Sequence, residues 1–282
     1  MYKLFFDINK QVLDNDLMIK EKEKVYQTSY DKFLNGSILV EQLIQGGRSG
    51  SDTILLSASV PAKPGETILE IGTGNGTAAI ALAKQIINLR ILAIDIDPIN
   101  LDIAKRNVIL NKLSENIQTL NEDILKKDIK FNINQEEIKS FDHIFMNPPY
   151  FDINKIVIPR SDQNKIAKSA NFNLIDGWLD ISIKLLKHNG TITIINKVSN
   201  LDQIMRKLSK YGSLIILPLV AHQNKEADRM IINFKMGSKS NTRILNAVVL
   251  HEEGGEYSND VEEVLRGRAR IDINKSKYFY QI

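Results

Sequence analysis

The segment 67–76, Thr-Ile-Leu-Glu-Ile-Gly-Thr-Gly-Asn-Gly, constrains the fold more than any other part of the chain. Its apolar residues predict a buried strand, and the alanine-rich segment 78–84 predicts a helix directly after the turn. Gly72, Gly74 and Gly76 allow positive φ angles and a close approach of the backbone to a ligand. The spacing is Gly-x-Gly-x-Gly and not Gly-x-Gly-x-x-Gly, so a dinucleotide is not the first choice of ligand.

Regular alternation of strands and helices follows this segment. Such alternation predicts an α/β fold, with a mostly parallel sheet covered by helices on both faces. The expected strands are 67–71, 90–95, 117–120, 142–146, 191–196, 214–217 and 230–234, and the expected helices are about 76–87, 98–111, 174–187 and 201–211.

Composition narrows the class of protein. The 282 residues include 43% hydrophobic residues, enough for the core of one large domain, and no cysteine, which excludes disulfides and thiolate metal sites. No apolar run reaches the length of a membrane span, and the N-terminus lacks the layout of a signal peptide. We therefore expect a cytoplasmic protein without a membrane partner or a metal. The net charge of +3 permits a nucleic-acid partner but does not argue strongly for one.

The flanking segments suggest a division into three parts. Residues 1–45 form an N-terminal arm, 46–236 the central domain and 237–282 a C-terminal extension on the same domain. Within the arm, residues 1–35 are polar and predict a solvated segment or a short surface helix. A glycine-rich turn then leads to Asp52, which either caps the following helix or faces a ligand beneath the turn.

Ligands of such sheets bind beyond the carboxyl ends of the strands. Glu70 and the glycine turn end the first strand, and Asp95 ends the second, about 20 residues after the turn, where a carboxylate can accept hydrogen bonds from a ribose diol. Asp123 follows the third strand and could accept from an adenine amino group, although a solvated loop carboxylate is the more common case. Together these residues predict an adenosine site.

The sequence Asn147-Pro148-Pro149-Tyr150 follows the fourth strand and predicts the chemistry. The side-chain carbonyl of Asn147 and the backbone carbonyl of Pro148 can accept both protons of a planar amino group. Such a grip stabilises the positive charge that develops on the nitrogen when it attacks an electrophile. Tyr150 can stack on a flat target, and a plain proline turn would leave the asparagine and the tyrosine unexplained.

These motifs, in this order, resemble those of Rossmann-type S-adenosylmethionine-dependent methyltransferases that modify an amino nitrogen. The resemblance implies S-adenosylmethionine as cofactor, a sheet of about seven strands, and an antiparallel strand at the sheet edge between strands five and six. It also implies a catalytic group of Asn147, Pro148 and Tyr150, with Pro149 and Tyr150 at the substrate. The implied cofactor-binding residues are Asp52, Glu70, Gly72, Gly74, Gly76, Asp95, Ile96, Asp123, Ile124 and Asn147.

More narrowly, the chain is similar to the bacterial tRNA(Val) adenine-N(6) methyltransferases over about residues 37–270. The segments Gly50-Ser51-Asp52-Thr53-Ile54-Leu55-Leu56, Leu250 to Tyr257 and Val264-Leu265-Arg266 carry this similarity. One departure is the longer polar stretch 126–140. The implied activity is transfer of a methyl group to the exocyclic amino nitrogen of an adenine in RNA, with tRNA as the favoured RNA. The sequence leaves the oligomeric state open, with a monomer slightly favoured.

The C-terminal tail is basic and gives weaker support for an RNA partner. Arg266, Arg268 and Arg270 would share one face if the tail is extended, with Tyr278-Phe279-Tyr280 as stacking surface, although a solvated tail fits the sequence equally well. Arg229 and Arg266 are the candidate substrate contacts, with Lys225 as a further candidate.

Two other functions remain open from the sequence. Enzymes that methylate a glutamine amide in a protein such as a release factor share Asn-Pro-Pro-Tyr, although they usually carry a helical N-terminal domain, and only about 66 residues precede the first strand here. The other is a non-catalytic RNA-binding protein that retains the fold, which the intact motifs disfavour.

Overall fold

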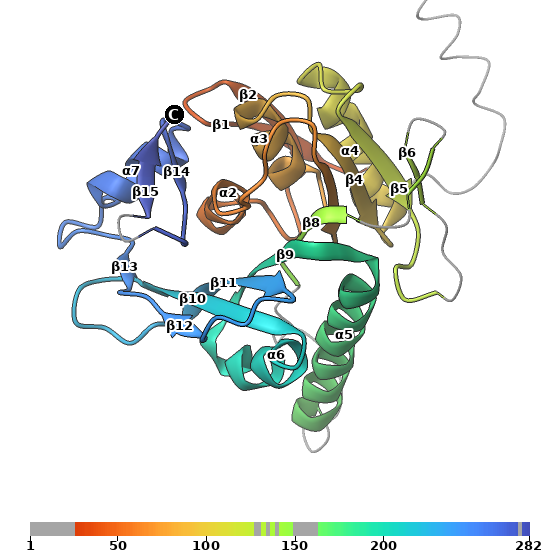
Figure 1. Cartoon of the computed structure of the whole chain (residues 1–282). Coiled ribbons are helices and arrows are strands. Elements are labelled where there is room, and N and C mark those ends of the chain that lie inside the picture. The colour runs from red at the N-terminus through yellow and green to blue at the C-terminus, as the bar shows by residue number, and fades with distance from the viewer. Residues whose placement is uncertain (1–25, 127–130, 134–135, 139–140, 149–162, 276–277) are drawn as a thin grey trace, which may run out of the picture.

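A computed structural model of the whole chain describes residues 26–126, 131–133, 136–138, 141–148, 163–275 and 278–282 (Figure 1). Its helical elements are α2 Ser51–Ala58, α3 Thr77–Gln85, α4 Pro98–Leu110, α5 Gln163–Leu185, η2 Val198–Asn200, α6 Leu201–Leu208 and α7 Asn259–Leu265. Its strands are β1 Thr28–Phe33, β2 Ile38–Leu43, β3 Thr67–Ile71, β4 Arg90–Asp95, β5 Ile117–Asn121, β6 Phe131–Ile133, β7 Glu136–Ile138, β8 Phe141–Met146, β9 Leu186–Lys197, β10 Gly212–Val220, β11 Arg229–Met236, β12 Arg243–Ile244, β13 Val248–Val249, β14 Ala269–Ile271 and β15 Phe279–Gln281.

The central sheet has the order β12-β10-β11-β9-β8-β3-β4-β5, with β13 paired beside β12 on β10. The strands from β9 to β5 pair in parallel, whereas β11 runs antiparallel between β9 and β10. The predicted α/β class and the antiparallel strand are thereby confirmed. Because the strand order turns around β3, the carboxyl ends of β3, β4 and β8 meet at one edge, where α/β sheets bind ligands.

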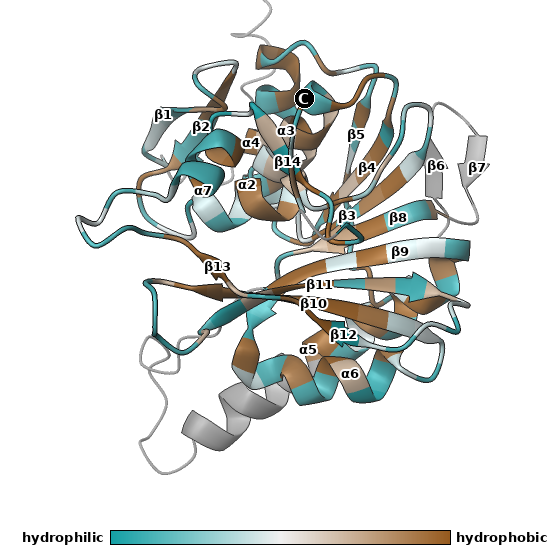
Figure 2. Ribbon diagram, turned by 60° about the vertical axis from the view of Figure 1, so that its left-hand side comes forward, coloured by the Kyte–Doolittle hydropathy of each residue, from teal (hydrophilic) through white to brown (hydrophobic). Residues whose placement is uncertain are grey.

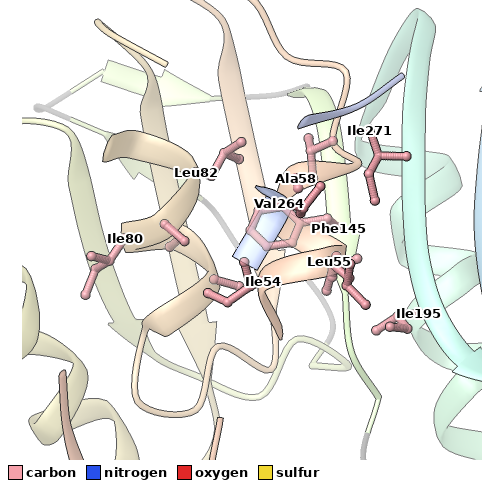
Figure 3. Packing of buried hydrophobic residues seen from close by; sticks show 14 of the residues in the cluster. Ile54, Leu55, Ala58, Ile80, Leu82, Phe145, Ile195, Val264 and Ile271 are labelled. Atoms are coloured by element: carbon pink, nitrogen blue, oxygen red, sulfur yellow. The ribbon is translucent and has the colours of Figure 1, made fainter. Parts of the chain in front are cut away.

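Both faces of the sheet are buried, which explains why its strands read as continuous apolar runs (Figure 2). In β3, Ile68 packs with the cluster under α2 and α3, and its neighbour Leu69 packs with the cluster under α5 and α6. Figure 3 shows the first cluster, in which Phe145 of β8 and Ile195 of β9 meet Leu55 of α2. A rigid, close-packed sheet therefore supports the edge at which the predicted site residues lie.

The described end of the N-terminal part departs from the expected solvated arm or surface helix, whereas residues 1–25 of that prediction lie outside the described residues. Residues 28–43 form an antiparallel hairpin of β1 and β2, which packs on α4. Asn107 of α4 accepts from the backbone of Glu41 at 2.7 Å and donates to its carbonyl at 2.9 Å, and Asn111 makes the same paired bonds to Leu39. These asparagines lie 66 and 72 residues after the β2 residues that they bind. The polar composition of the N-terminal segment could not indicate such distant partners.

The C-terminal arginines do not share one exposed face, so that prediction is wrong. Arg266 ends α7, and Gly267 has a φ of +74°, which breaks the extended run. Arg270 is 3% exposed and donates to the carbonyl of Val60 at 2.6 Å and to Gln85 at 2.8 Å. The side chain therefore joins the C-terminal segment to the end of α2 and to α3 and does not face solvent.

The polar stretch 126–140 contributes the short hairpin of β6 and β7, which pairs outside the central sheet. In the described part of the chain, no helix is both long and apolar enough to cross a membrane. The division of the chain at residues 45 and 236 remains a prediction.

Candidate active site

The three glycines of the turn that follows β3 all adopt the positive φ angles that the sequence predicted. Gly72, Gly74 and Gly76 have φ angles of +72°, +56° and +82°, and Gly76 is the residue before α3. The amide of Gly72 donates to the carbonyl of Ile94 at 2.9 Å, which fastens the turn to β4. Because side chains rarely adopt these φ angles, the three glycines are needed for the path of the backbone.

Asp95, at the end of β4, contacts the same turn. Its Oδ2 accepts from the amide of Gly74 at 2.7 Å, and its Oδ1 accepts from the amide of Asp97 at 2.9 Å. Burial raises the pKa of the Asp95 carboxyl, and the two amide bonds oppose that shift. A carboxylate oxygen has more than one lone pair, so both oxygens keep capacity for a ribose diol. The bond to Gly74 shows that Asp95 also stabilises the glycine turn.

Glu70 lies beneath the turn and is 4% exposed. Its Oε2 accepts from the hydroxyl of Thr73 at 2.6 Å. Burial raises the pKa of Glu70 to about 8, and the neighbouring Asp95 carboxylate adds to the increase. The side chain supports the glycine turn from below; its predicted contact with the cofactor remains a prediction.

Replacing Glu70 with glutamine is expected to flatten the pH dependence of stability. The folded pKa lies above the ordinary value of 4.5, so the folded state binds more protons, and stability falls as pH rises from about 4.5 to about 8. Glutamine keeps an acceptor for Thr73 and removes this fall, with a gain on the order of 1–3 kcal/mol at pH 8 relative to pH 5. Urea unfolding of both proteins at pH values from 5 to 9 measures how the free energy of unfolding depends on pH. A slope equal to that of the wild type would contradict the assignment, and a residual slope from Asp95 is expected.

Asn75, within the turn, connects it to the N-terminal hairpin. Its Oδ1 accepts from the hydroxyls of Ser49 at 2.9 Å and Thr77 at 2.7 Å, and its Nδ2 donates to Gln42 of β2 at 2.8 Å. The loop before α2 therefore contacts the glycine turn, and the interpretation that Asp52 of this loop faces a ligand remains a prediction. Ser49 and Gln42 escaped the sequence analysis because ordinary polar residues in a loop and a strand carry no motif.

Two predicted site residues, Asp52 and Arg229, form an ion pair. The Arg229 guanidinium donates to Oδ1 and Oδ2 of Asp52 at 2.7 and 2.6 Å, which joins the start of α2 to the start of β11. Gly50 is the residue before α2, and Asp52 makes no capping bond, so the capping interpretation is wrong. The pair lies at the carboxyl edge of the sheet, beside the ends of β9 and β8.

The predicted adenine-binding residues lie after β4 and β5. Asp123 accepts from the amide of Leu125 at 2.9 Å in a local turn, so its carboxylate is partly engaged. Ile124 is buried in the core, whereas Ile96 is 66% exposed at the edge. An exposed apolar side chain at this place fits the face of a nucleobase.

Asn147 and Pro148 follow β8 at the same edge as the glycine turn. The Oδ1 atom of Asn147 is buried and has no hydrogen-bond partner among the described residues. A buried acceptor without a partner is rare, because it costs about 1–3 kcal/mol. A ligand donor would satisfy it, as expected for an amine-binding asparagine. Pro149 and Tyr150 lie outside the described residues.

Trp178 of α5, the single tryptophan of the chain, packs against Gly72. A Cβ at Gly72 would lie 2.6 Å from Cη2 of the indole. Sequence reasoning missed this residue, since an aromatic side chain on an apolar helix face reads as ordinary core.

Replacing Gly72 with alanine is expected to destabilise the fold by about 2–4 kcal/mol, because it combines a positive φ with an overlap on Trp178. Thermal unfolding followed by tryptophan fluorescence measures both the loss and the shift of the indole. Gly65, with a φ of +87° and open space around its Cβ position, is the matched control for the backbone effect alone. Equal losses at the two positions would contradict a steric role for Trp178.

Arg266, the other predicted substrate contact, is half-exposed and pairs with Glu262 within α7 at 2.5 Å. It contacts the turn between β1 and β2 through Asn35 at 3.5 Å. Arg266 directly follows α7, and its bonds among the described residues are to Glu262 and Asn35 and not to the glycine turn.

A cavity of about 360 Å³ lies between α4 and the N-terminal hairpin. It is lined by Tyr26, Thr28, Glu41, Pro98, Ile99, Asp102, Ile103 and Arg106. Its polar groups are largely committed to the Arg106–Glu41 ion pair of 2.9 Å. The groups that match a nucleoside and an amine lie instead at the ends of β3, β4 and β8, so the chemistry favours that edge as the active site.

The residues at this edge fit S-adenosylmethionine. The glycine turn lets the backbone approach the ligand, Asp95 offers carboxylate oxygens, Ile96 offers an apolar surface and Asn147 offers an unsatisfied acceptor. Fold and site together define the class of protein, an S-adenosylmethionine-dependent methyltransferase.

Comparison with known proteins gives the family. Residues 62–248 match the family described as "Methyltransferase domain", and the chain belongs to that family. A tRNA1(Val) (adenine(37)-N6)-methyltransferase of Bacteroides thetaiotaomicron is 27% identical over 219 residues, which are 76% of this chain and 88% of the relative. A protein of the same name from a Flavobacteriaceae bacterium is 30% identical over 225 residues, which are 76% of this chain and 87% of the relative.

Solved structures agree on the fold. The crystal structure of a predicted O-methyltransferase from Agrobacterium tumefaciens superposes with a TM-score of 0.63 and 19% sequence identity. The match covers 78% of this chain and 98% of the other. The family match over residues 62–248 confirms the methyltransferase class predicted from the sequence, and the predicted cofactor is the one that this class uses.

Proposed function

We propose that this enzyme methylates the exocyclic amino nitrogen of an adenine in tRNA. The observation that carries the proposal is the buried Oδ1 of Asn147 at the carboxyl end of β8, which has no partner in the part of the chain that the structure describes. The relatives named as tRNA1(Val) (adenine(37)-N6)-methyltransferases support it, since they match this chain over most of their own length.

The reaction requires two hydrogen-bond acceptors, one for each N–H group of the target amine. The lone pair of an adenine amino group is delocalised into the ring, so the planar nitrogen is a poor nucleophile. Asn147 Oδ1 and the carbonyl of Pro148 accept its two N–H groups and stabilise the positive charge as the nitrogen bonds to carbon. S-adenosylmethionine, when bound, supplies an electrophilic methyl group, and S-adenosylhomocysteine leaves. The new ammonium then loses one proton, which gives the methylated amine.

The finer assignments belong to this proposal. The glycine turn receives the methionine part of the cofactor, Asp95 the ribose, and Asp123 with Ile96 and Ile124 the adenine. Tyr150 stacks on the target base. Lys225 and Arg266 are candidate phosphate contacts, whereas Arg229 is engaged with Asp52. We propose a cytoplasmic monomer with tRNA as its partner, a central domain at 46–236 and flanking segments on the same domain.

Nucleosides from the tRNA of a deletion strain test the proposal. Loss of one methylated adenosine, restored by the wild-type gene but not by a gene encoding Asn147→Ala, is the expected result. An unchanged tRNA profile together with an unmethylated release factor would overturn it in favour of glutamine methylation. An unchanged profile of both would favour the non-catalytic alternative.

A further inference from the structure

Two consecutive residues of α5 contact the two loops that are proposed to hold the cofactor. Trp178 packs against Gly72 of the glycine turn, where an added Cβ would lie 2.6 Å from Cη2 of the indole. The residue before it, Gly177, lies against Leu125, which follows Ile124 of the predicted adenine site. Successive residues of a helix point about 100° apart, so neighbouring positions of α5 can reach two different loops.

The glycine at position 177 lies inside a helix, where glycine is less stable than alanine. Gly177 is not among the glycines with a positive φ, so the path of the backbone does not require it. A Cβ at this position would lie 2.8 Å from Cδ2 and 3.3 Å from Cδ1 of Leu125. The missing side chain therefore allows the loop after β5 to approach α5 closely.

This part of α5 is held in place from other directions. The carboxylate of Asp176 accepts from Gln203 of α6 at 3.0 Å, and the hydroxyl of Ser182 donates to the carbonyl of Trp178 at 2.6 Å. Trp178 is buried in the cluster under α5 and α6, whereas Leu125 is 43% exposed. Because a close-packed core yields little, a larger side chain at position 177 displaces Leu125 and its loop and not the helix.

We propose that Gly177 and Trp178 are positioning residues, which set the distance between the glycine turn and the loop after β5 and so the fit of S-adenosylmethionine between them. The inference rests on the cofactor contacts in the proposed function and is independent of the RNA substrate. Trp178 supports the loop at the methionine end, and Gly177 lets the loop at the adenine end come close to the same helix. A ligand that spans two loops binds more tightly when both are held at the required distance before it arrives.

Calorimetric titration of Gly177→Ala with S-adenosylhomocysteine tests this spacing. The added methyl group displaces Leu125, so the affinity is expected to fall about 5- to 50-fold. Alanine favours the helix, so urea unfolding should show little change in stability. Gly177→Ala combined with Leu125→Ala removes the overlap and is expected to bind as tightly as Leu125→Ala alone. A purely structural role for Gly177 predicts no such rescue.

Trp178→Phe tests the other contact in the same titration. The shorter phenylalanine ring no longer reaches Gly72, and a similar fall in affinity is expected. Leu179→Ala is the matched control, because Leu179 is a fully buried neighbour in the same cluster. This control should lose stability in urea and keep the affinity of the wild type.

Wild-type affinity of Gly177→Ala, or a loss that Leu125→Ala does not restore, would overturn the inference. Equal losses of affinity in Trp178→Phe and Leu179→Ala would overturn it as well, since any defect in the cluster would then have the same effect. Failure of the wild-type protein to bind S-adenosylhomocysteine would instead count against the proposed function.

Discussion

Replacing Asn147 with alanine is expected to lower the rate of methyl transfer by about 10²- to 10³-fold, while S-adenosylmethionine binds with nearly unchanged affinity. The side-chain oxygen of Asn147 is buried and unpaired, so its removal costs the folded protein no hydrogen bond among the described residues. What it removes is one of the two acceptors that we propose stabilise charge on the amine. Single-turnover rates with tRNA, and cofactor affinity by calorimetry, measure the two quantities separately.

The control for Asn147 is Asn233→Ala, which removes a buried amide from the same sheet. That variant loses its bond to Thr193 and some stability, yet it should keep turnover. Full activity of Asn147→Ala would show that the proposed grip on the amine is wrong. A parallel loss of cofactor affinity would show that Asn147 serves the cofactor and not the amine.

Replacing Asp95 with alanine is expected to weaken S-adenosylmethionine binding by about 10- to 100-fold. Two effects act in the same direction. The ribose diol loses its acceptors, each bond to a charged acceptor being worth about 1.5–3 kcal/mol, and the amide of Gly74 loses the partner that holds the turn. Calorimetric titration with the cofactor measures the loss, which should appear in affinity more than in the rate at saturating cofactor.

Asp97→Ala is the matched control, two residues along the chain. Asp97 caps α4 by accepting from the amide of Ile99 at 2.9 Å, so its loss should cost about 1 kcal/mol of stability and little affinity. If the two variants weaken cofactor binding equally, a general loosening of this loop explains the result, and the ribose contact is wrong.

The features that sequence predicted well are local. The glycine turn, the strand before it and the helix that begins at Pro98 follow from residues that are neighbours in the chain. Asp97, which the structure shows as the cap of that helix, belongs to the same short signal.

The features that sequence did not predict depend on distant partners. Asp52 and Arg229 are 177 residues apart, and each alone suggested a helix cap or a phosphate contact. The sequence predicted that Arg270 is an exposed charge. Nothing near it in the chain indicates that its guanidinium donates to the carbonyl of Val60.

The contact between Arg270 and Val60 has a consequence for biosynthesis. α2, beside the glycine turn, is covered on its outer side by α7 and β14, whose residues Val264 and Ile271 complete the cluster in Figure 3. The bond from Arg270 to Val60 spans 210 residues. While the chain is still on the ribosome, α2 therefore lacks this cover after the whole catalytic edge has been translated. The helix beside the glycine turn therefore gains its full support only once α7 and β14 have been made and have packed on it.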